Sequence, residues 1–102
     1  MADTKADGRT AANNVTPPVP IDTPDPEYTR EARKARIEGV VQLFIVVDEK
    51  GKARDIKVSG SLRPDLDQKA IEAVTHWRFK PATKNGHPIP VHMSVEITFK
   101  LH

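Results

Sequence analysis

The sequence contains no cysteine, and this absence removes several kinds of chemistry. A disulfide framework, a zinc site with thiolate ligands and a thiol nucleophile are all excluded. The chain also has no apolar run near the roughly 18 residues that cross a bilayer, and its first twenty residues lack the apolar stretch of a signal peptide. We therefore expect any membrane anchor or export signal of the protein to lie outside these 102 residues.

The chain also has no large excess of positive or negative charge. Sixteen Lys and Arg residues against fourteen Asp and Glu residues give a net charge of +2, and the two signs are interspersed. Because nucleic-acid-binding domains usually gather basic residues on one face, we expect no nucleic-acid partner. The sequence shows no phosphate-binding loop, no nucleophile elbow and no pair of carboxylates spaced for catalysis. It therefore predicts a protein that is not an enzyme and that uses no cofactor or metal.

Aromatic residues are few, and only 37% of the chain is hydrophobic, so the folded core should be small and single. Residues 1–15 are polar and without periodicity, which predicts a disordered tail. Five of the nine prolines fall in residues 17–26 and predict a semi-rigid spacer. We place the domain boundary near Asp25, with residues 1–24 as tail and linker and residues 25–102 as the domain.

The first periodic part of the domain is a helix followed by a strand. Residues 29–38 are rich in Ala, Arg, Lys and Glu, start at Thr29 as N-cap and precede Gly39, so they predict a helix. Residues 40–47 carry apolar side chains on both faces. This pattern is typical of a strand in the middle of a sheet.

A hairpin turn at residues 48–51, with Gly51 suited to a left-handed conformation, leads into a second strand over residues 53–59. After a loop, Asp65 and Gln68 have the spacing of a capping box and predict the start of a helix. One face of this helix carries an apolar stripe, formed by Leu66, Ala70, Ala73, Val74 and Trp77.

Proline at position 81 cannot continue this helix, and the pair Asn85-Gly86 marks a turn. The last segment, residues 90–101, alternates apolar and polar side chains, which predicts a strand with one buried and one exposed face. The fold class is therefore α+β, a small αββαβ domain. Its antiparallel sheet has three strands in the order 2-1-3, with two helices on one face and the last strand at an edge. Most of the core should come from Trp77, Phe79, Phe44 and Phe99.

These segments resemble the C-terminal domain of TonB-family energy transducers over most of residues 25–101. The matching pieces are an entry segment, a first strand with its turn, a helix with a Trp-Arg-Phe-x-Pro-Ala motif, and a turn before a closing strand, at residues 28–39, 39–51, 66–82 and 85–101. The chain departs from the family at Thr29, where proline often follows the tyrosine. This departure alters the helix entry and leaves the fold prediction intact.

The resemblance implies that the closing strand binds the TonB-box peptide of an outer-membrane transporter by β-strand addition. An exposed edge strand leads to the same expectation, because its unpaired N–H and C=O groups can pair with an extended peptide. The family's segment before the tyrosine also contacts the transporter. The residues predicted to bind peptide are Pro90, Val91, His92, Met93, Ser94, Val95, Glu96, Ile97, Thr98, Phe99, Asp25, Pro26 and Glu27.

The resemblance further implies a periplasmic location and a role in nutrient uptake, driven by a proton-powered inner-membrane complex that would be reached through a region outside this chain. Two alternatives stay open for the edge strand. Pro90, Glu96 and Lys100 could protect it from pairing, or it could pair with a second copy to form a homodimer. A different function is an envelope interaction or dimerisation module at the end of a membrane sensor or peptidase.

Other patterns favour ordinary structural roles. The four histidines have no spacing suited to a metal site, and His92 with Glu96 fits an exposed strand face better than an acid–base pair. Trp77 lies on the apolar stripe, which favours core packing over ligand stacking.

Overall fold

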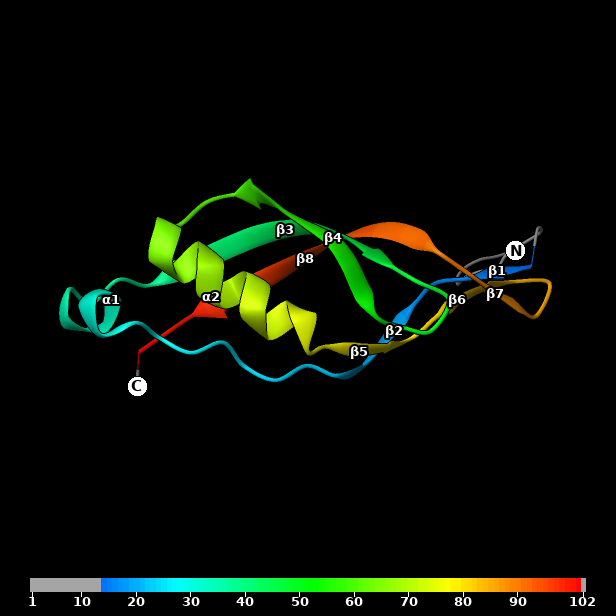
Figure 1. Ribbon diagram of the computed structural model, residues 1–102, viewed down its shortest axis with the longest axis horizontal. Coiled ribbons are helices and arrows are strands. Elements are labelled where there is room, and N and C mark those ends of the chain that lie inside the picture. The colour runs from blue at the N-terminus through cyan, green and yellow to red at the C-terminus, as the bar shows by residue number, and fades with distance from the viewer. Residues whose placement is uncertain (1–13, 102) are drawn as a thin grey trace, which may run out of the picture.

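The centre of the main sheet is β3 (Gly39–Val47), which lies between β4 (Ala53–Gly60) and β8 (Val91–Phe99) in antiparallel pairing (Figure 1). The computed structural model describes residues 14–101. Alternate side chains of β3 point into the core, because successive residues of a strand face opposite sides of a sheet. The four core-facing residues are almost fully buried: Val41, Leu43, Ile45 and Val47.

The helix α2 (Pro64–Thr75) packs across β3 and β4 and covers this buried face (Figure 1). Its predicted apolar stripe is largely confirmed, since Leu66, Ala70 and Val74 are fully buried. Trp77 lies beyond the helix end and is only partly buried. From β8, Ile97 and Phe99 complete the core. Helices and antiparallel sheets together confirm the α+β class.

The first helix is shorter than the sequence predicts. Thr29 is its N-cap as expected, and its side chain accepts a hydrogen bond from the Ala32 N–H. The helix α1 (Arg30–Lys34), however, ends well before residue 38. Arg36 adopts a left-handed conformation with φ 56°, and the Ile37 N–H returns to the Ala32 carbonyl oxygen at 3.0 Å. This is the hydrogen-bond pattern that closes helices, here with arginine where glycine is usual.

The start of α2 also differs from the prediction of a capping box at Asp65 and Gln68. The N-cap is Arg63, without a side-chain capping bond, and Pro64 takes the first helical position. Asp67 stabilises this entry instead, because its carboxylate accepts hydrogen bonds from the Ser61 hydroxyl and from the N–H groups of Leu62 and Arg63.

Between α2 and β8, three short strands extend the fold beyond the main sheet. After α2 come β5 (Arg78–Lys80) and a hairpin of β6 (Ala82–Lys84) with β7 (His87–Ile89). The predicted turn is confirmed, since Asn85 and Gly86 both have positive φ angles, 53° and 79°. The predicted last strand over residues 90–101 is shorter, because Pro90 separates β7 from β8.

The prediction of a spacer over residues 17–26 is wrong for its first half. Within it, β2 (Val19–Asp22) pairs with β5, and just before it β1 (Val15–Thr16) pairs with β6. Both are edge positions, where proline is tolerated. The predicted tail lies mostly outside the described residues, and the boundary near Asp25 stays a prediction.

The second face of β3 is not covered by a helix within the described residues. Val40 and Phe44 are 39% and 56% exposed there. The expectation that Phe44 belongs to the core is therefore wrong, whereas Phe79 and Phe99 are buried as predicted. α2 covers the opposite face, and α1 lies beyond one end of the sheet (Figure 1).

Candidate functional site

The main sheet has two edge strands, and they differ in regularity. The pairing of β4 with β3 shifts register twice, and Asp55 within β4 has a left-handed φ of 50°. α2 also packs against this strand. Bulges and a covering helix are common ways to make an edge unsuitable for a further strand.

The edge formed by β8 is regular throughout. All nine of its residues pair with β3 without a shift, from Val91 opposite Val47 to Phe99 opposite Gly39. Within residues 14–101 no other strand pairs with its second side. Such an edge presents unpaired N–H and C=O groups to an extended chain.

The residues suspected of protecting this edge do not interrupt it. Pro90 precedes β8 and Lys100 follows it, so both lie outside the paired stretch. Glu96 is inside β8, but its carboxylate accepts a hydrogen bond of 3.2 Å from the Gln42 side chain on the neighbouring strand. The edge backbone is thus continuous from Val91 to Phe99.

The core-facing side chains of β8 are buried to different degrees. Ile97 and Phe99 are 2% exposed, as expected for core residues. Val91, Met93 and Val95 are only partly buried, although they pack against the core. Because α2 packs over β3 and β4, this half of β8 has a partly open apolar face beside its open backbone edge.

Asp25, Pro26 and Glu27 lie between β2 and α1, and they meet only the C-terminal end of β8. Together with Thr98 and Phe99 they line a surface hollow of about 940 Å³. The basic residues around this hollow were not predicted from the sequence. Arg33, Lys34 and Arg36 follow Thr29 closely, and this spacing was the available signal. Lys100, which directly follows β8, also lines the hollow.

Two side chains, Tyr28 and Trp77, hold this segment in place. The Tyr28 hydroxyl donates to the Ile37 carbonyl oxygen at 2.7 Å, and its ring meets Phe99 edge-on with centroids 5.5 Å apart. Burial, and next to it the Glu38 carboxylate, raise the pKa of Tyr28. The Trp77 indole N–H donates to the Pro24 carbonyl oxygen at 3.0 Å.

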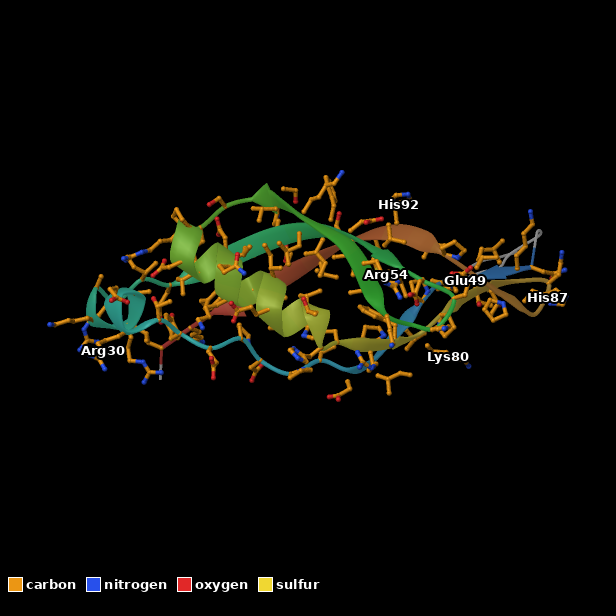
Figure 2. The ribbon with its side chains drawn as sticks, viewed as in Figure 1. Arg30, Glu49, Arg54, Lys80, His87 and His92 are labelled. Carbon is orange, nitrogen blue, oxygen red and sulfur yellow. The ribbon has the colours of Figure 1, made fainter. Side chains whose placement is uncertain are left out.

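The outward face of β8 carries polar side chains. His92 points away from α2 (Figure 2) and lies four residues from Glu96, about 13 Å along a strand. This spacing is too long for the direct acid–base pair that the sequence suggested as an alternative. Within the described residues no three His, Asp or Glu side chains gather into a metal site. No helix in that part is long and apolar enough to span a membrane.

Comparison with known proteins gives consistent matches. The family model for the C-terminal domain of the Gram-negative bacterial TonB protein matches residues 24–101. The TonB protein of Vibrio cholerae is 36% identical over 92 residues, which cover 82% of this chain and 38% of that protein. The tonB2 protein of Pseudomonas aeruginosa is 37% identical over 83 residues, covering 80% of this chain and 31% of that protein.

A solved structure is also similar. The solution NMR structure of the Pseudomonas aeruginosa TonB C-terminal domain superposes with a TM-score of 0.68 at 25% identity, covering 92% of this chain and 93% of that chain. By contrast, this chain spans only about a third of the length of the curated relatives it matches, from 31% to 38%.

Proposed function

The chain belongs to the family of Gram-negative bacterial TonB C-terminal domains, and from this premise we propose that its β8 edge binds the TonB-box peptide of an outer-membrane transporter. The peptide would add a fourth strand to the main sheet. No bond of the peptide is made or broken in this step, so the function is mechanical coupling and not catalysis.

The observation that carries the proposal is the contrast between the two sheet edges. β4 is bulged twice, whereas β8 is straight over nine residues and open on one side. An added strand needs regular spacing of N–H and C=O groups, because each hydrogen bond depends on the register of the one before it. Only the β8 edge of the main sheet meets this condition.

The expected affinity is weak. About five backbone hydrogen bonds, at about 0.5 to 1.5 kcal/mol each, correspond to dissociation constants in the millimolar to micromolar range. The partly open face of Val91, Met93 and Val95 would add apolar contact with alternate peptide residues. Asp25, Pro26 and Glu27 would contact the part of the transporter chain that extends past the C-terminal end of β8, near Thr98.

We further propose that the domain works in the periplasm and passes force from an inner-membrane, proton-driven complex to the transporter during nutrient uptake. Membership of the TonB family supports this role, and the region that would engage the inner-membrane complex would lie outside the matched third of the relatives. A homodimer formed by pairing of two β8 edges would use the same groups and would compete with the peptide.

Crosslinking tests the proposal directly, because the chain has no cysteine of its own. Ser94→Cys places one thiol in the middle of β8, and Ser59→Cys places one on β4 as a matched control on the other edge. With a mild thiol oxidant present, a box peptide with a single cysteine should form a disulfide with the Ser94→Cys variant and much less with the control. Equal crosslinking of the two variants would contradict the assignment of β8.

A further inference from the structure

The face of the main sheet opposite α2 carries an exposed aromatic side chain at its centre. Phe44 lies in the middle of β3 and is 56% exposed. The same face carries Val46 next to it and, beyond Gln42, Val40, which is 39% exposed. Solitary exposed apolar residues are common on protein surfaces, but an aromatic ring on a central strand with aliphatic residues on the same face is typical of an interface.

Polar residues of both signs surround this centre. Phe44 is paired with Lys57 of β4 and with Ser94 of β8. A shallow hollow of about 720 Å³ includes Phe44 and these neighbours, with Asp55 and His92 on its rim. An apolar centre within a polar rim is the usual anatomy of a protein–protein contact. The mixed charges make the face a poor match for an anionic membrane surface.

The outer face is continuous with the proposed peptide-binding edge. Ser94 belongs to β8 and is the direct cross-strand neighbour of Phe44. Adjacent strands lie about 4.8 Å apart, so a peptide added to β8 would lie about 10 Å from the strand that carries Phe44. A folded partner that carries the peptide can therefore reach this face.

We propose that the folded body of the transporter that supplies the peptide docks on this outer face, with Phe44 as its apolar anchor. This inference rests on the proposed function, since it takes the peptide at β8 as the first contact. When one partner makes two contacts, formation of the first raises the effective concentration for the second. A weakly bound peptide and a small apolar patch on the same transporter can therefore give a much higher affinity together than either gives alone. A buried aromatic anchor is the residue type that most often dominates such contacts.

The test uses two probes from the same organism: an intact TonB-dependent transporter in detergent micelles, and a synthetic peptide with that transporter's box sequence. Each is titrated against the unaltered chain, Phe44→Ser and Ile21→Ser. Ile21 is the matched control, because it is 69% exposed and lies on β2, away from the outer face. Circular dichroism confirms that each variant is folded.

We expect Phe44→Ser to weaken binding of the intact transporter by about tenfold or more and to change peptide binding by less than about twofold. Ile21→Ser should change neither. Unchanged transporter binding by Phe44→Ser would overturn the inference, and so would an equal loss for peptide and transporter. A dimer that Phe44→Ser dissociates, seen by sedimentation, would assign the face to a second copy and also overturn it. Failure of the unaltered chain to bind the peptide would instead contradict the proposed function.

Discussion

The Trp77 indole N–H donates a hydrogen bond of 3.0 Å to the carbonyl oxygen of Pro24, and so joins the segment that follows α2 to the chain that enters α1. The residues that follow Pro24 run on to the end of β8, where they line the same hollow as Thr98 and Phe99. This one bond therefore helps to place Asp25, Pro26 and Glu27 beside the candidate edge.

Replacing Trp77 by phenylalanine should free this segment without disturbing β8. The change keeps an aromatic ring next to Phe79, at 6.2 Å between centroids, and removes the N–H donor. We expect the free energy of unfolding to fall by about 1 kcal/mol, measured by urea denaturation. Backbone ¹⁵N relaxation should show greater motion of residues 24–27. Unchanged motion there would mean that the hydrogen bond does not hold the segment.

Gly51 should be far more sensitive to substitution than Gly86, although both have φ 79°. A Cβ at Gly51 would lie 1.9 Å from the Phe79 carbonyl oxygen, whereas a Cβ at Gly86 meets nothing within 4 Å. Gly86→Ala should cost about 1 kcal/mol, the usual strain of a left-handed residue. Gly51→Ala should cost more than about 2 kcal/mol, because the backbone of β5 must also move. Thermal unfolding of the pair measures the difference, and equal losses would contradict the close approach.

Asp67 should stabilise the start of α2, whereas Gln68 should not. Asp67→Ala leaves two backbone N–H groups and the Ser61 hydroxyl without their acceptor, so we expect a loss of about 2 kcal/mol. Gln68 is exposed, and Gln68→Ala should change the free energy of unfolding by less than about 0.5 kcal/mol. Urea denaturation measures both losses. A larger loss for Gln68→Ala than for Asp67→Ala would contradict this assignment and support the capping box that the sequence predicted.

Asp48 should make the stability depend on acid pH. Hydrogen bonds from the Lys52 N–H, the Arg54 side chain and the Lys50 N–H hold its pKa at about 2, below the ordinary 3.8. The unfolded chain therefore takes up the proton first as pH falls. The contribution of Asp48 should be fully present above about pH 4 and should be lost as pH falls through about 2. The difference in free energy of unfolding between the unaltered chain and Asp48→Asn should shrink over this window, and a constant difference would contradict the assignment.

Burial periodicity explains why parts of the fold could be predicted from the sequence. Alternation along β8 and the stripe on α2 identify the core face, since side-chain direction follows directly from strand and helix geometry. Phe44 shows where this reasoning fails. An apolar side chain indicates that a face could be covered, but whether a layer covers it depends on where the two helices pack.

Other features depended on contacts between distant residues or on unusual conformations. Pro20 pairs with Phe79, so the strand β2 exists only because β5 lies beside it, and the prolines alone favour a spacer. The end of α1 depends on Arg36 in a left-handed conformation that arginine rarely adopts. The open edge of β8 could be predicted from the strand order. The hollow beside Glu27 could not, because it depends on the path of the chain between β2 and α1.

The central claim, that an extended peptide pairs with β8, is tested most directly by NMR titration of the ¹⁵N-labelled chain with a TonB-box peptide from a transporter of the same organism. The largest shift changes should fall on the amides of Val91 to Phe99 and on their partners in β3, with little change along β4. Changes confined to β4, or to residues far from β8, would contradict it.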